Sequence, residues 1–167
     1  MLRELIHLYK YGRVKPLAGP LGELLAAALP REEPFDAVVP VPLHWRRQWQ
    51  RGFNQSELLA RAIARRSGIP VVRALRRVRP TLTQAGLSNT DRRRNVAAAF
   101  RCRGARRVEG RRILLIDDVM TTGATAAACA LALKRAGARK VALLTVARVD
   151  RRMDRGAVGQ FTVGGAA

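Results

Sequence analysis

The chain has 167 residues, of which 48% are hydrophobic, and it carries a formal net charge of +20 at pH 7. This length suits a single domain with a buried core. The apolar residues lie in short separate runs, none near the roughly 20 residues that a membrane span needs, which argues against a membrane protein. The first residues lack the long apolar stretch of a secretory signal, so we expect a cytoplasmic protein.

The positive charge is almost entirely arginine, because only four residues are lysines. A composition rich in alanine and arginine can reflect genome base composition alone. A charge of this size nevertheless attracts polyanions, so phosphate ligands and nucleic acid are both live hypotheses. Charge alone does not choose between them.

The first half of the chain contains three predicted helices and one predicted strand. Apolar spacing predicts two short amphipathic helices, at 2–11 and 17–29, separated by a break rich in glycine and proline. A β-branched run at 35–43 predicts a strand, whose two prolines favour a stop at its carboxyl end. After a polar, aromatic and basic loop, a third helical pattern begins at Ser56 and ends at Gly68.

The middle of the chain is less regular. A second strand is predicted at 69–78, and periodicity is then lost over 79–90, which we interpret as a mobile loop. A capping pattern opens a short basic helix at 91–96. A short strand is expected at 98–102, and the basic stretch 103–112 is typical of turns.

The clearest buried strand is predicted at 112–116. A loop of acids and threonines follows it, then a helix at about 124–136 that ends before Gly137, and then a strand at 140–149. This strand, helix and strand have the size of a βαβ unit, which requires a parallel sheet.

These elements predict an α/β fold: a single domain with a mostly parallel, twisted sheet flanked by helices. We expect the domain to cover residues 1–150. Residues 151–167 show no sustained pattern and are expected to form a weakly ordered tail, first basic and then rich in glycine and alanine.

The stretch ILLIDDVMTTGATAAA at 113–128 carries the strongest functional signal. In an open parallel sheet, ligands bind beyond the carboxyl ends of the strands. The unpaired N–H groups and the dipole at the start of the next helix favour an anion there. Gly123 allows a close turn around a phosphate, and threonine hydroxyls can donate to its oxygens: Thr121, Thr122 and Thr125.

Asp117 and Asp118 require a different partner, because carboxylates repel a phosphate at contact distance. Hydroxyl groups or a metal ion would suit them. A phosphate beside a vicinal diol satisfies both halves of the motif, which indicates a ribose 5-phosphate. A single aspartate or threonine near a helix start is usually a cap, but two acids with TTG and a further threonine exceed what capping requires.

The segment IDDVMTTGAT resembles the phosphoribosyl pyrophosphate (PRPP) signature of type I phosphoribosyltransferases. Further blocks resemble the ComF family and stand in that family's order: LIHLYKYG at 5–12, VVPVPLHWRRQWQRGFNQ at 38–55 and QAGLSNTDRRRNVAAAF at 84–100. The resemblance implies a type I phosphoribosyltransferase-like fold and transfer of phosphoribosyl from PRPP with release of pyrophosphate. The acceptor is not implied.

The resemblance also implies roles for individual residues. Asp117 and Asp118 hold the ribose hydroxyls, and Arg51 is the charge partner of the pyrophosphate. The ribose 5-phosphate segment is Val119, Met120, Thr121, Thr122, Gly123, Ala124 and Thr125. The pyrophosphate loop includes Leu43, His44, Arg51, Asn54 and Gln55. The flexible loop that closes the site contributes Gln84, Arg92 and Asn95.

Magnesium (Mg²⁺) is the implied cofactor, held mainly through the ligand rather than directly by the protein. Many ComF relatives carry a cysteine-rich zinc module ahead of the 5–12 block, a block that here stands almost at the start of the sequence. The only cysteines are Cys102 and Cys129, with no CxxC pair, so neither zinc nor a disulfide framework is expected in this chain.

Other interpretations stay open at this point. The protein could bind PRPP as a sensor, without transfer. It could instead be a non-catalytic factor for DNA uptake that binds single-stranded DNA or another nucleic acid through the basic segments 92–94, 101–112 and 151–155. Arg46 and Arg47 fit solvated loop residues as well as ligand contacts, and Phe53 fits core packing better than stacking. Association into homo-oligomers is left open.

Overall fold

A computed structural model describes residues 17–29, 34–43, 52–78, 99–120, 122–148 and, for the backbone alone, 160–162. Predictions for residues 1–16 and 79–98 therefore lie outside the described residues. The described elements follow in chain order: α2 (Ala18–Ala27), β1 (Ala37–Pro40), α4 (Gln55–Ser67), β2 (Leu75–Arg77), β3 (Phe100–Cys102), the 3₁₀ turn η2 (Ala105–Arg107), β4 (Arg112–Met120), α6 (Ala124–Arg135), β5 (Lys140–Arg148) and β6 (Gln160–Thr162).

The main sheet has the strand order β1-β4-β5-β6. Strand β4 lies between β1 and β5 and is parallel to both, while β6 is antiparallel to β5. Strands β2 and β3 form a separate antiparallel ribbon. The structure thus confirms the predicted α/β fold with a mostly parallel sheet, and β4, α6 and β5 form the predicted βαβ unit.

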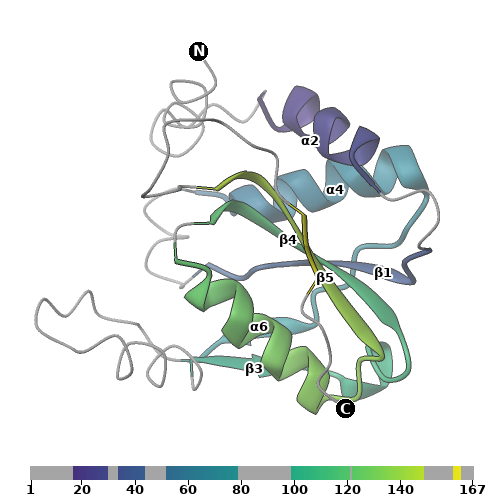
Figure 1. Ribbon diagram of the computed structural model, residues 1–167, viewed down its shortest axis with the longest axis vertical. Helices are drawn as coiled ribbons and strands as arrows, with labels where there is room; N and C mark the ends of the chain where they lie inside the picture. The colour runs from purple at the N-terminus through teal and green to yellow at the C-terminus, as the bar shows by residue number, and fades with distance from the viewer. Residues whose placement is uncertain are drawn as a thin grey trace, which may run out of the picture.

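Helices cover both faces of the sheet, as Figure 1 shows, with α2 and α4 on one face and α6 on the other. Side chains of β4 alternate between the two cores because successive strand residues point to opposite faces. Ile113 and Leu115 pack in the cluster that contains α6, β2 and β3, whereas Leu114 and Ile116 pack in the cluster that contains α2 and α4. All four side chains are buried, so β4 is the centre of the fold.

Helices α2 and α4 approach closely at one point. A Cβ atom built on Gly22 would collide with the Cβ of Ala62, so only a glycine fits at this position of α2. The two helices share the cluster that contains Leu21, Leu25 and Leu59. This contact positions α4 across the sheet.

Most helix predictions are confirmed within one or two residues. Helix α4 begins at Gln55 and ends at Ser67, with Gly68 in the left-handed conformation that closes a helix. Helix α6 ends at Arg135 and is followed by Gly137, which also has a positive φ. Among the described residues, no helix is both long and apolar enough to cross a membrane.

The predicted strand at 69–78 is only partly correct. Val71 forms an isolated parallel bridge to Val38 of β1, and regular pairing begins only at Leu75, where β2 meets β3. The segment leaves the edge of β1 after Val72, whose N–H donates to the carbonyl of Val38. The segment 69–78 therefore pairs with two different partners, β1 and β3.

Strand boundaries differ at the end of β4 and near the carboxyl terminus. The prediction ended the central strand at 116, but β4 continues to Met120 because β5 pairs with it through Met120↔Arg148. Three residues of the predicted tail form β6, which sequence analysis did not predict. The remaining residues of 149–167 lie outside the described residues.

Candidate functional site

The two adjacent acids lie on the central strand near its carboxyl end, not in the loop after it. Asp117 stands opposite Thr145 of β5 in the parallel register. The starts of α4 and α6 lie at this same edge: the Ser56 side chain reaches Asp117, and α6 begins four residues after β4 ends. The structure thus brings the acids, two helix N-termini and the end of β1 together at the carboxyl ends of the parallel strands, where ligands bind in such sheets.

Hydrogen bonds fix one oxygen of each carboxyl group. Oδ1 of Asp117 accepts from the hydroxyl of Ser56 (3.2 Å) and from the N–H of Asp118 (2.9 Å). Oδ1 of Asp118 accepts from the N–H of Val119 (2.8 Å), and the buried Thr145 hydroxyl donates to the Asp118 carbonyl (3.1 Å). The two carboxyl groups also interact with each other, since the side chain of Asp118 raises the pKa of Asp117.

The electrostatics of the pair are unusual. Desolvation by the surrounding protein, followed by repulsion from Asp118, raises the pKa of Asp117 to about 7. The hydroxyl of Ser56 acts in the opposite direction and lowers this pKa. A carboxyl group that titrates near neutrality in a functional position is a marker of binding or catalysis.

The turn into α6 has the geometry expected of an anion-binding loop. Gly123 is the N-cap residue, with φ 74°, and no side chain caps the helix. The N–H of Ala124 donates to Oγ1 of the exposed Thr122 at 3.4 Å, and Ala124 and Thr125 are half-buried. Met120 is only 6% exposed, so its side chain belongs to the core and only its backbone can face a ligand. Thr121 lies outside the described residues.

The predicted pyrophosphate loop is described only at its two ends. Leu43 is half-buried, and His44 and Arg51 lie outside the described residues. Asn54 caps α4: its Oδ1 accepts from the N–H of Ser56 (3.1 Å), and its Nδ2 donates to the carbonyl of Val41 (3.0 Å). The structure therefore gives Asn54 a structural role that sequence analysis did not predict.

Two further residues of the RGFNQ segment are buried. Gln55 is 1% exposed and Phe53 is 8% exposed. The core role predicted for Phe53 is confirmed. Burial of Gln55 within the first turn of α4 leaves its side chain little access to a ligand in the loop.

The predicted flexible-loop residues Gln84, Arg92 and Asn95 lie outside the described residues, but the ribbon that precedes and follows the loop is described. Arg76 and Arg101 stand directly opposite each other in this ribbon, and both are exposed. The Arg77 guanidinium lies over the Phe100 ring, 5.4 Å from its centroid.

Two residues of the site, Ser56 and Thr145, were not predicted from the sequence. The pattern at Ser56 indicated only a helix start, although a polar residue in the first turn of a helix that follows a neighbouring strand lies at the ligand-binding edge. Thr145 is a single polar residue within the apolar run VALLTVA, and it is fully buried. Buried polar side chains need partners, which was a signal in the sequence.

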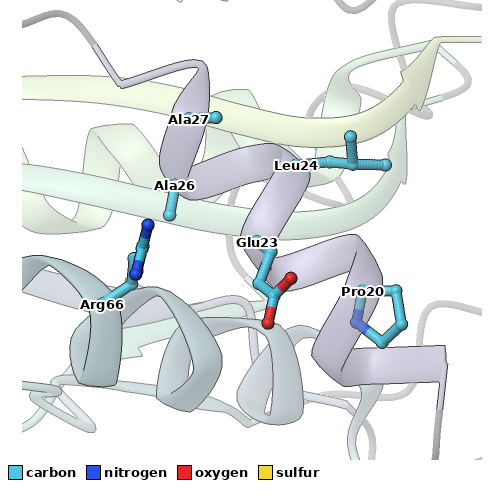
Figure 2. A pocket seen from close by; sticks show the side chains of 6 residues that line it. All are labelled: Pro20, Glu23, Leu24, Ala26, Ala27 and Arg66. Atoms are coloured by element: carbon cyan, nitrogen blue, oxygen red, sulfur yellow. The ribbon is translucent and has the colours of Figure 1, made fainter.

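A surface groove elsewhere on the protein is shown in Figure 2, between α2 and the end of α4. Arg66 lines it from α4, and the exposed Leu24 is among the side chains that α2 contributes. Arg66 and Ser56 are ten positions apart on α4, which corresponds to about 15 Å. The groove is therefore separate from the acid pair.

The described residues contain no group of three or more His, Cys, Asp or Glu side chains that could hold a metal ion. Cys129 is buried in the core on α6, and Cys102 is half-buried on β3. Both cysteines are free thiols, and burial raises the pKa of each.

Comparisons with known proteins agree with the resemblance of the segment IDDVMTTGAT to a phosphoribosyltransferase signature. Residues 54–159 match the family described as "Phosphoribosyl transferase domain". Competence protein F of Haemophilus influenzae is 39% identical over 115 residues, which cover 68% of this chain and 50% of that protein. DNA utilization protein YhgH of Escherichia coli (strain K12) is 38% identical over 154 residues, covering 88% of this chain and 67% of that protein.

Among solved structures, a glutamine phosphoribosylpyrophosphate (PRPP) amidotransferase from B. subtilis, complexed with ADP and GMP, is similar with a TM-score of 0.55 and 26% identity. The match covers 78% of this chain and 26% of that one. The chain thus spans half to two thirds of the length of the two curated relatives, and a quarter of this solved structure.

Proposed function

Because the chain belongs to the ComF family of type I phosphoribosyltransferase-like proteins, we propose that its acid pair and the start of α6 bind PRPP and transfer its phosphoribosyl group to an acceptor. The observation that carries the proposal is the pair of adjacent carboxyl groups, Asp117 and Asp118, near the carboxyl end of β4. They lie at the edge of the sheet where α6 begins with an uncapped, glycine-led turn.

The acid pair suits the ribose hydroxyls of PRPP, and the start of α6 suits its 5-phosphate. Ionised carboxylates accept hydrogen bonds from the two ribose hydroxyls. The N–H groups at the start of α6, with the hydroxyls of Thr122 and Thr125, donate to the 5-phosphate. The adjacent placement of a diol and a phosphate in ribose 5-phosphate matches the adjacent placement of acids and helix start.

In the proposed reaction, the bond between C1 of the ribose and the pyrophosphate oxygen breaks, and pyrophosphate leaves with the electron pair. A nucleophilic atom of the acceptor forms the new bond to C1 and loses a proton. The protein positions the sugar and stabilises the departing charge, a role that the family resemblance gives to Arg51.

Magnesium enters the proposal as a companion of PRPP. The ion would be held mainly by ligand oxygens, with Asp117 and Asp118 beside it. When bound, magnesium neutralises part of the pyrophosphate charge.

Calorimetric titration with PRPP and Mg²⁺ tests the proposal. We expect the wild-type protein to bind, and Asp118→Asn to weaken binding by about tenfold or more, because a hydrogen bond to a charged group is lost. Glu109→Gln is a matched control: it removes the same charge from an exposed side chain on the loop before β4. No binding by the folded wild-type protein refutes the proposal, and binding without pyrophosphate release for any acceptor favours a sensor.

A second candidate function, association with nucleic acid, has its own observation at the opposite edge of the sheet. The loops before β4 and β5 lie together there, since the N–H of Arg139 donates to the carbonyl of Arg111. We call the exposed arginines of this region the basic edge: Arg106, Arg107, Arg111, Arg135 and Arg139. The names of the two curated relatives, which refer to competence and DNA utilization, point in the same direction.

Fluorescence anisotropy with a single-stranded oligonucleotide tests this second function. Reversing charge at Arg106 and Arg107 together, as Arg106→Glu with Arg107→Glu, should weaken binding of the oligonucleotide. The slope of log affinity against log salt concentration should become shallower by roughly 0.7 per lost phosphate contact. Arg65→Glu with Arg66→Glu is the matched control on α4. Equal losses in both pairs mean that net charge, not the basic edge, attracts the oligonucleotide.

A further inference from the structure

We propose that Ser56 is a positioning residue of the phosphoribosyl site: its hydroxyl holds Oδ1 of Asp117, so that Oδ2 is presented to the sugar hydroxyls. This inference rests on the proposed function and adds a residue to it. The distance from Oγ of Ser56 to Oδ1 of Asp117 is 3.2 Å, and the N–H of Asp118 donates to the same oxygen at 2.9 Å. Oδ1 of Asp117 therefore has two donors, one from α4 and one from β4 itself.

Ser56 is itself held rigidly. It is 4% exposed, and its N–H donates to Oδ1 of Asn54, the cap of α4. The amide of Asn54 in turn donates to the carbonyl of Val41, just beyond β1. Asn54 and Ser56 together therefore connect the end of β1 to the acid on β4. Ser56 and Asp117 are 61 positions apart in the sequence.

The Ser56 hydroxyl also favours the ionised carboxylate, which is the form that accepts from a diol. The groups that act on Asp117 come from several elements. Desolvation and the Asp118 side chain raise its pKa, whereas the backbone N–H of Asp118 and the Ser56 hydroxyl lower it. On α6, burial and then the charge of Asp117 raise the pKa of the Cys129 thiol, while the charge of Arg77 lowers the pKa of this thiol. Of the described side chains that act on Asp117, the Ser56 hydroxyl lowers its pKa and the Asp118 carboxyl raises it.

The substitution Ser56→Ala removes this single bond while preserving the helix cap, because Asn54 receives the backbone N–H and not the hydroxyl. Ser67→Ala is a matched control at the other end of α4, where the hydroxyl donates to the carbonyl of Ile63 at 2.9 Å. Ser56→Thr retains a hydroxyl and should restore function.

The test combines PRPP titration with Mg²⁺ over pH 6–9 and ¹³C NMR titration of the Asp117 carboxyl without ligand. For Ser56→Ala we expect about tenfold weaker binding at pH 7 and a pH midpoint of binding above that of the wild type. The NMR titration of Asp117 should move to higher pH as well. Ser67→Ala should match the wild type, and Ser56→Thr should lie close to it.

The outcomes separate this inference from the function on which it rests. If the wild type fails to bind PRPP, the proposed function and this inference both fall. If both proteins bind equally, or if Ser56→Ala binds more weakly at every pH with an unchanged Asp117 titration, the proposed function stands and this inference is overturned. The NMR titration reports on Asp117 even where the variant binds no ligand.

Discussion

The raised pKa of Asp117 has a consequence for stability, and Asp117→Asn exposes it. For an acid, a folded-state pKa of about 7 against an ordinary value of 3.8 means that the folded protein binds the proton more tightly than the unfolded chain. The free energy of unfolding of the wild type therefore falls as pH rises from about 4 to about 7. Ionised Asp117 is the destabilised form.

The size of the effect follows from the shift. Each unit of pKa corresponds to about 1.4 kcal/mol, so a shift of this size amounts to at most about 4 kcal/mol between the two ends of the pH range. Asparagine has nearly the same shape and does not titrate. Relative to the wild type, Asp117→Asn should therefore gain stability as pH rises, by most of this amount between pH 5 and pH 8.

Urea denaturation of both proteins at several pH values measures this difference, and subtraction cancels the groups that they share. Asp36→Asn is a control of opposite sign. Hydrogen bonds from Arg112 lower the pKa of Asp36 to about 2, so its contribution is fully present at pH 5–8 and is lost only as pH falls towards 2. The difference in free energy of unfolding between Asp36→Asn and the wild type should therefore be constant over pH 5–8. If the difference in free energy of unfolding between Asp117→Asn and the wild type is also constant over pH 5–8, Asp117 does not have a raised pKa in the folded protein.

Two further predictions concern α2 and α4. Gly22→Ala should destabilise the protein by about 1–3 kcal/mol, because the new Cβ collides with Ala62, whereas Gly19→Ala on the same helix meets nothing within 4 Å and should stabilise it by up to about 1 kcal/mol. Thermal denaturation of both variants checks this contrast, and equal effects would contradict it. Glu57→Gln should cost about 1 kcal/mol at low salt and less in 1 M NaCl, because Oε1 of Glu57 accepts from Arg61 (2.8 Å) and from Nε of Arg73 (2.9 Å). A loss that does not change with salt would contradict this account.

Local signals explain which parts of the fold could be predicted. The periodicity of 55–67 and the glycine after it define α4 without reference to the rest of the chain. The length of β4 depends instead on β5, which begins 20 residues after β4 ends. Two acids and a valine after an apolar run resemble the start of a loop, and only the pairing with β5 keeps them in the strand. Strand boundaries set by a distant partner are not readable from a local pattern.

The same distinction applies to the site. The chemistry of Asp117, Asp118 and the TTG turn could be inferred from residue types and order alone. The link from Ser56 to Asp117 could not, because it depends on how α4 crosses the sheet, a crossing that the close contact of Gly22 and Ala62 helps to fix. Asn54 was a missed local signal, since asparagine is a preferred cap immediately before a helix.

The two proposed binding regions can operate independently on one small domain. Asp118 and Arg112 are six positions apart on β4, which corresponds to about 20 Å along the strand, whereas charges in solution are screened over about 8 Å at physiological salt. A phosphodiester backbone is repelled by the acids at one edge and attracted by the arginines at the other. Saturating PRPP should therefore leave oligonucleotide affinity nearly unchanged. Competition between the two would place the oligonucleotide at the acid edge, where the geometry favours a sugar diol instead.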